Sequence, residues 1–173
     1  MQIGSKFYPG SGAPSPTAEL PLMLVVASSL FVLALAVWPL PGWAKSLRPE
    51  LPLMLVVYWI VSQPFRIGMI YAWLLGVTLD LLTGSVLCQH ALALTIVAYL
   101  VFLFHQRTAV YSMTQQGFAL FGLVALYHLL NYWIYGLTGG AHLDFSILLS
   151  ALTSALLWAL FRTVLDALVV RLR

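Results

Sequence analysis

The chain has 173 residues, of which 62% are apolar and only 8% are charged. Because a soluble domain carries about 25% charged residues, this composition excludes an ordinary soluble fold and predicts a polytopic membrane protein. The net charge of +3 requires no nucleic acid, since the basic residues stand at the ends of apolar runs. The single cysteine excludes an internal disulfide and a metal site built from several thiolates.

The chain begins with a polar segment that is followed by a first apolar run. Residues 1–19 are rich in glycine, proline and serine, and we expect a flexible cytoplasmic tail without a cleavable signal peptide. Residues 20–38 form the first predicted spanning helix, because a run of about twenty residues matches a hydrocarbon core about 30 Å thick. Pro39 and Pro41 end this helix. We expect residues 20–173 to form one membrane domain.

Five further apolar runs predict an all-α bundle of six transmembrane helices. The runs at 51–63 and 67–82 are short for a full span, because the first of them, with thirteen residues, rises only about 20 Å. The remaining helices are predicted at 86–105, 117–137 and 145–170. Both termini then lie on one side of the membrane. Most of the Lys and Arg residues fall on that side, so we predict that both termini are cytoplasmic.

A stripe of small residues marks the helix predicted at 67–82 and its end. Gly68, Ala72, Gly76, Asp80 and Gly84 recur every four residues and would lie on one face of a helix. Small residues at this spacing let the backbone of a neighbouring helix approach closely in lipid. The stripe therefore predicts a tight packing face that contains one carboxylate.

The carboxylate of Asp80 has two interpretations that the sequence leaves open. An ionisable group within a bilayer is costly unless it is paired, so Asp80 would anchor a partner helix, a cation or an arginine such as Arg66 or Arg107. Alternatively, Asp80 lies near a helix end and is solvated or capped there by neighbouring hydroxyl groups. For Arg66 itself, a position in a tight turn as a topology marker is the simpler interpretation.

The other polar residues within apolar runs also have a structural and a functional interpretation. Gln89 and His90 begin a predicted helix, where hydrogen bonding at the helix end is the simpler role. His128, Asn131 and Tyr135 form a polar stripe that either packs inside the bundle or lines a ligand pocket.

Patterns typical of catalytic sites are missing from the sequence. It contains no phosphate-binding glycine loop that ends in Lys-Ser or Lys-Thr, no HExxH and no G-x-S-x-G, and its four histidines are scattered. We therefore expect no enzymatic activity, no cofactor and no metal ion.

The central stretch, residues 48–94, resembles the MreD family of rod shape-determining proteins. The likeness rests on an ordered set of short motifs: Arg48-Pro49, Tyr58-Trp59, Pro64 with Arg66 and Gly68, Gly76 with Asp80, Gly84-Ser85 and Gln89-His90-Ala91-Leu92. Two features depart from the family. Cys88 stands where the family usually has glycine, and the polar tail before Glu19 is longer than usual.

The resemblance implies a multi-pass protein of the bacterial inner membrane that helps build the lateral cell wall. It would bind MreC and, through it, influence MreB, RodA and a class B penicillin-binding protein, with no nucleic acid involved. We expect the membrane helix of MreC to dock on the helices predicted between 51 and 105. The hypothesised contact residues are Arg66, Gly68, Ala72, Gly76, Asp80, Gly84, Gln89 and His90.

The family fold is also similar to the six-helix substrate-binding subunits of energy-coupling-factor vitamin transporters. This similarity suggests an alternative function, the binding of a vitamin-like small molecule. The small-residue stripe with one acid favours helix docking, since a vitamin site requires a larger pocket with more polar and aromatic groups.

Overall fold

The structure, a computed structural model, describes residues 22–39, 41–42, 46–63, 67–86, 88–108, 112–137 and 146–171. This part of the chain is helical, with α1 (Leu22–Val37), α3 (Leu51–Ser62), α4 (Met69–Thr83), α5 (Gln89–Thr108), α6 (Met113–Leu137) and α7 (Ser146–Arg171). The all-α prediction is therefore confirmed, and each predicted helix has a counterpart in the structure. The expected tail, residues 1–19, lies outside the described residues.

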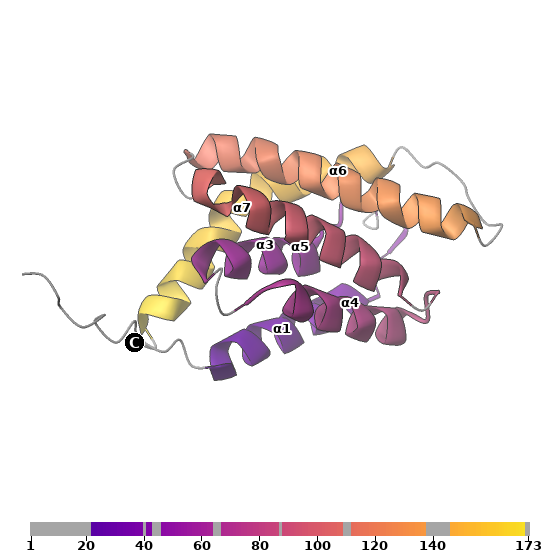
Figure 1. Ribbon diagram of the computed structural model, residues 1–173, viewed down its shortest axis with the longest axis horizontal. Coiled ribbons are helices and arrows are strands. Elements are labelled where there is room, and N and C mark those ends of the chain that lie inside the picture. Colours follow the sequence, from indigo (N-terminus) through magenta and orange to yellow (C-terminus); the bar gives the residue numbers. More distant parts are fainter. Residues whose placement is uncertain are drawn as a thin grey trace, which may run out of the picture.

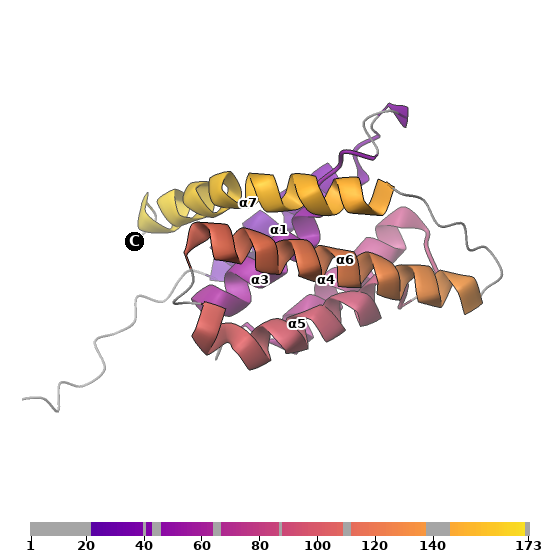
Figure 2. The ribbon, with the colours of Figure 1, turned by 90° about the horizontal axis from the view of Figure 1, so that it is seen from above.

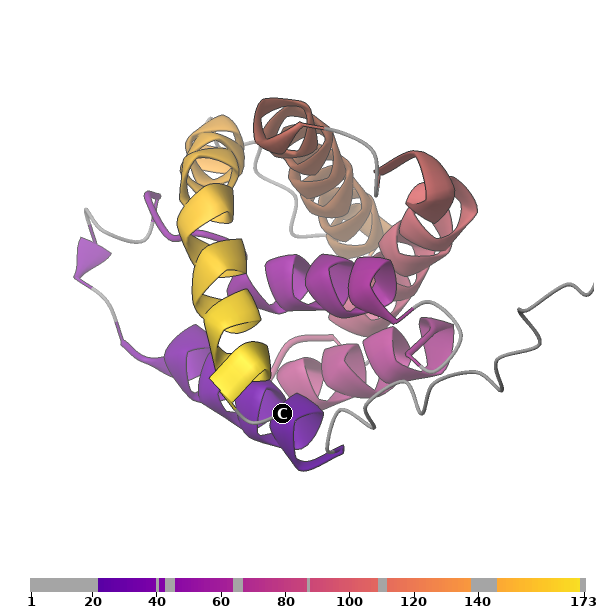
Figure 3. The ribbon, with the colours of Figure 1, turned by 90° about the vertical axis from the view of Figure 1, so that its left-hand side faces the viewer.

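The short helix α3 forms the centre of the bundle. Figure 3 shows the other helices arranged around it, and α3 contacts α1, α4, α5 and α7. Pro52 stands in its first turn, where a missing N–H group costs no hydrogen bond. Every residue from Pro52 to Ile60 is buried. A helix that is apolar on all sides is expected to be enclosed by protein, so its shortness reflects an interior position.

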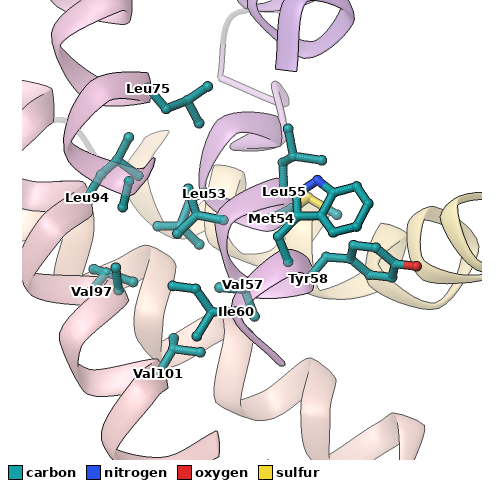
Figure 4. Close-up of a cluster of buried hydrophobic side chains, with 14 of the residues drawn as sticks. Leu53, Met54, Leu55, Val57, Tyr58, Ile60, Leu75, Leu94, Val97 and Val101 are labelled. Carbon is teal, nitrogen blue, oxygen red and sulfur yellow. The ribbon is translucent and has the colours of Figure 1, made fainter. Parts of the chain in front are cut away.

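The core side chains of α3 meet neighbouring helices on opposite sides. In the close-up of Figure 4, Val97 and Val101 of α5 lie on one side of α3, whereas Tyr58 points away from them. The Tyr58 hydroxyl donates a hydrogen bond of 2.7 Å to Asp166 of α7. One face of α3 is thus held by apolar packing against α5, and another is tied to α7 by a polar contact.

Two helix pairs flank this centre. The helices α4 and α5 pack against each other, as do α6 and α7, and Figures 1 and 2 show α6 and α7 side by side. The predicted helix at 86–105 begins later than expected, at Gln89, because Gly84 ends α4 in a left-handed conformation and a turn follows. The predicted helix at 117–137 begins earlier, at Met113.

Helix length separates the elements into two groups. Two segments, Met113–Gly136 and Ile147–Arg171, are long and apolar enough to cross a membrane. The apolar helices Leu22–Val37, Leu51–Ser62, Met69–Thr83 and Gln89–Phe104 are shorter. The predicted count of six spans and the predicted orientation stay predictions.

Candidate functional site

The buried carboxylate of Asp80 binds the beginning of α5. Its side chain is in the last turn of α4, and the residue is only 1% exposed. Asp80 Oδ1 accepts hydrogen bonds from the backbone N–H of His90 at 2.9 Å and from the Ser85 hydroxyl at 2.8 Å. Oδ2 accepts a longer bond of 3.3 Å from the N–H of Ala91. The first N–H groups of a helix have no partner within it, so Asp80 caps α5 from the neighbouring helix.

The histidine next to this cap adds a side-chain contact. His90 Nδ1 lies 2.7 Å from Asp80 Oδ1, and the Ser85 hydroxyl lies 3.2 Å from the same ring nitrogen. A negative carboxylate is also favoured at a helix N-terminus by the helix dipole. Asp80 therefore acts as a helix cap that is also bound by the Ser85 hydroxyl. Its carboxylate is buried between α4 and α5 and is not solvated. Arg66 lies outside the described residues, as does the side chain of Arg107.

The turn between α4 and α5 brings Asp80 and His90 together through two left-handed residues. Gly84 has φ of 65°, and Cys88 has φ of 72°. Glycine adopts this region freely, but a side chain makes it costly. The carbonyl of Cys88 accepts the N–H of Leu92, so Cys88 occupies the start of α5. Cys88 therefore occupies a position at which this backbone favours glycine.

Gly76 lets the backbones of α4 and α5 touch. A Cβ atom added to Gly76 would lie 2.4 Å from the Cα of Ala91 and 2.7 Å from its nitrogen. Ala72, one turn earlier, is fully buried. At Gly68 and Gly84, by contrast, an added Cβ would meet open space. The tight packing face predicted from the stripe is real at its centre, and the helix that occupies it is α5 of the same chain.

This arrangement changes what the hypothesised contact residues can offer to another protein. Gly76 lies against Ala91 of α5 and Asp80 is hydrogen-bonded to the start of the same helix, so a partner helix could reach these two residues only if α5 moved away. Ala72 is buried too. Gln89 is buried as well. The binding of a partner by this set stays a prediction, whereas the intramolecular contact explains the need for glycine at position 76.

A second polar cluster joins the start of α3 to α6 and α7. The Ser150 hydroxyl donates to the carbonyl of Arg48 at 2.8 Å, and the N–H of Glu50 donates to the Ser154 hydroxyl at 2.9 Å. His128 Nε2 lies 3.4 Å from the Glu50 carboxylate and 3.3 Å from the Ser150 hydroxyl. Burial raises the pKa of Glu50 from 4.5 to about 7, and the positive charge of Arg48 acts in the opposite direction.

The predicted stripe of His128, Asn131 and Tyr135 does not face a single pocket. His128 belongs to the cluster around Glu50, and the Asn131 amide donates to the carbonyl of Tyr127 at 2.9 Å. Tyr135 is 46% exposed. The first two residues thus pack inside the bundle, as one of the two interpretations proposed, and Tyr135 turns outward.

A small polar pocket lies between the two clusters. Its volume is about 180 Å³, and its lining includes Arg48, Glu50, Thr83, His90 and Tyr127. The Tyr127 ring bridges the clusters, because its centre lies 6.1 Å from that of His90 and 5.6 Å from that of His128. No local pattern in the sequence connects Arg48 and Glu50 to His90, because the residues that line the pocket come from five separate segments of the chain.

The other end of α7 carries a third set of polar contacts. Arg162 Nε lies 3.6 Å from Asp166 Oδ2, and Arg162 also donates to Gln116 of α6. Trp158 Nε1 donates to the same Gln116 oxygen at 3.1 Å. Polar side chains therefore tie α7 to α3 and α6, and Arg162 and Asp166, four residues apart, also pair along α7.

Comparisons with known proteins agree with the resemblance that the central motifs suggest. Residues 18–168 match the family described as rod shape-determining protein MreD. A curated relative, rod shape-determining protein MreD of Haemophilus influenzae, is 30% identical over 128 residues, which cover 74% of this chain and 78% of the relative. No solved structure matches the chain.

Proposed function

Because the chain belongs to the MreD family of rod shape-determining proteins, we propose that it is a non-catalytic inner-membrane component of the rod complex that binds MreC. Through MreC, it would act on MreB, RodA and a class B penicillin-binding protein and so help organise lateral peptidoglycan synthesis. Family membership itself supports the role in determining rod shape.

The distribution of polar and apolar side chains supports a scaffold that works through contacts between helices. The buried polar groups described above bind one another across helix boundaries, as in the contacts of Asp80 with α5, Glu50 with α7 and Tyr58 with Asp166. The outer faces of α1, α4 and α7 instead present large apolar side chains. Such faces suit lipid and single membrane helices, since helix association in a bilayer depends on close apolar packing.

The outward face of α4 is our proposed docking surface for the MreC helix. It is formed by Ile70, Leu74 and Leu81, which follow helical spacing and are all more than half exposed. This face belongs to the stretch that carries the family motifs, and it lies opposite the stripe that α5 covers. The MreC helix would therefore dock on the expected segment, but on the side of α4 that faces away from α5.

Site-specific photo-crosslinking in the native host tests this docking surface. A photoreactive residue at Leu74 should cross-link to MreC, whereas the same residue at Leu156, which is 73% exposed on α7, should not. Equal cross-linking from both positions, or none from Leu74 while MreC still co-purifies, would contradict docking on α4.

The alternative function, binding of a vitamin-like molecule, makes a different prediction for affinity purification. The polar pocket of about 180 Å³ is smaller than the ~300–1,000 Å³ typical of small-molecule sites. A groove of about 530 Å³ beside it has Ser28 as the one polar residue of its lining, which does not suit a polar vitamin-like ligand and supports the scaffold. Mass spectrometry of the purified protein should find MreC and wall synthases. A retained vitamin-like compound together with an ATPase module would instead identify a transporter subunit.

A further inference from the structure

An apolar groove meets the polar pocket at the start of α3. The groove has a volume of about 530 Å³ and runs between α1 and α7, with walls that include Phe31 and Leu165. Leu51 lines both the groove and the polar pocket, and the consecutive residues Leu35 and Ala36 line the groove and the pocket respectively. Figures 1 and 3 show the end of α7 close to the beginning of α1, with α3 between their other ends. A long apolar site is thus joined to a small charged one.

The charges in the pocket indicate which polar headgroup would suit it if an amphiphilic molecule occupied both sites. Arg48 and Glu50 both line the pocket, so it offers a cation and a carboxyl group on the same short segment. Guanidinium groups bind phosphate in a directional manner, and carboxylates bind ammonium groups through charge-assisted hydrogen bonds. A headgroup with only a negative charge would contact Arg48 and offer no hydrogen-bond donor to the half-buried carboxyl group of Glu50.

We propose that the groove and the pocket together bind a zwitterionic phospholipid with a primary ammonium group, as in phosphatidylethanolamine. Its phosphate would contact Arg48, its ammonium group would contact Glu50, and one acyl chain would lie between α1 and α7. A choline headgroup fits less well, because its nitrogen has no N–H to donate to the carboxylate. The bound lipid would fill the space between the first and the last helix of the bundle.

Native mass spectrometry of the full-length protein in detergent tests this binding. Phosphatidylethanolamine, phosphatidylglycerol and phosphatidylcholine with identical acyl chains are added in turn. We expect phosphatidylethanolamine to be retained about tenfold better than the other two, the ratio that one charge-assisted hydrogen bond supports. Equal retention of the three lipids would overturn the headgroup assignment.

Variants separate the two halves of the site. Glu50→Gln should remove the preference among the headgroups, and Arg48→Gln should lower retention of every phospholipid. Ala27, which lines the groove, can be replaced by tryptophan to fill it, with Val26→Trp as the control, because Val26 is exposed on the same helix and does not line the groove. Ala27→Trp should reduce retention of all lipids several-fold, and Val26→Trp should leave it unchanged.

Two controls keep the test decisive. Each variant must elute as a single species and unfold at a temperature close to wild type. The Ala27 and Val26 pair remains informative if a pocket variant fails this criterion. Soluble phosphoethanolamine should compete poorly, because it lacks the acyl chain that the groove would hold. Equal loss of lipid in both tryptophan variants would overturn the groove assignment. Co-purification of MreC is measured separately, so failure of lipid binding is distinguishable from failure of the scaffold function.

Discussion

Asp80 illustrates how one buried carboxylate can hold two helices together. Its oxygens accept two backbone N–H groups from the first turn of α5 and one hydroxyl from the connecting turn. A buried donor that loses its acceptor costs about 1–3 kcal/mol, so the carboxylate contributes most through the groups that it satisfies. The same logic explains why an acidic residue is tolerated inside an otherwise apolar bundle.

Replacing Asp80 should therefore destabilise the protein in proportion to the acceptors removed. Asp80→Ala is expected to lower the free energy of unfolding by about 1–3 kcal/mol, and Asp80→Asn by less, because it keeps one oxygen acceptor. Thermal unfolding in detergent measures the difference. Thr78→Ala, an exposed change on the same helix, serves as the control. An Asp80→Ala protein as stable as wild type would show that the cap is not stabilising.

The backbone conformation of Cys88 leads to a second prediction about stability. Among the described residues, it is the one non-glycine residue with positive φ. A left-handed conformation costs an ordinary residue about 1–2 kcal/mol, and β-branched residues tolerate it worst. Cys88→Gly should thus stabilise the protein by up to about 1 kcal/mol, after the greater freedom of glycine in the unfolded chain is counted. Cys88→Val should destabilise it. Opposite shifts in thermal unfolding are expected, and equal shifts would contradict the strain.

At the scale of elements, the α4–α5 hairpin depends on direct backbone contact. The position of Gly76 against Ala91 leaves no room for even one methyl group, and the cap by Asp80 follows one turn later. Packing and capping thus act on the same two helices. The hairpin also supplies Thr83 and His90 to the polar pocket, so its closeness positions part of the proposed lipid site.

Gly76→Ala should consequently separate the two helices. Overpacking of a close contact costs about 1–3 kcal/mol and sometimes more, and here the new atom would meet backbone that cannot rotate away. Gly122→Ala on α6, where an added Cβ meets open space, is the matched control and should be neutral or slightly stabilising. Similar effects of both substitutions on thermal unfolding would contradict the tight contact.

At the scale of the whole molecule, the proposed topology places the polar pocket at the periplasmic face. The connections before α3 and between α4 and α5 would then lie outside, and the connection between α5 and α6 would lie in the cytoplasm. The lipid site would consequently select its headgroup from the outer leaflet of the inner membrane, whereas the polar contacts of Arg162 would lie near the cytoplasmic side.

Cysteine accessibility tests this topology directly. In a Cys88→Ser background, Val86→Cys should react with a membrane-impermeant maleimide in intact spheroplasts, and Ser112→Cys should react only after the membrane is opened. Both positions are exposed in the structure, so the difference reports the side of the membrane. Labelling of Ser112→Cys in intact spheroplasts would reverse or refute the six-span arrangement.

The sequence by itself determined the helical class, the approximate position of each helix and the family, because apolar runs, prolines and spaced motifs are local signals. It also predicted a tight packing face on the stripe that contains Gly76, since small residues at helical spacing indicate close approach. The sequence did not show which helix covers this face. The same spacing of small residues is expected whether the face packs against another protein or against the next helix of the chain.

Only the tertiary structure decided where the polar groups meet. Glu50 and Ser154 lie far apart in the chain but are 2.9 Å apart across their hydrogen bond, and Tyr58 reaches Asp166 in the same way. Such contacts depend on how whole helices pack, which no local pattern encodes. The pocket, its junction with the groove and the burial of Asp80 beneath α5 are for this reason properties of the folded bundle.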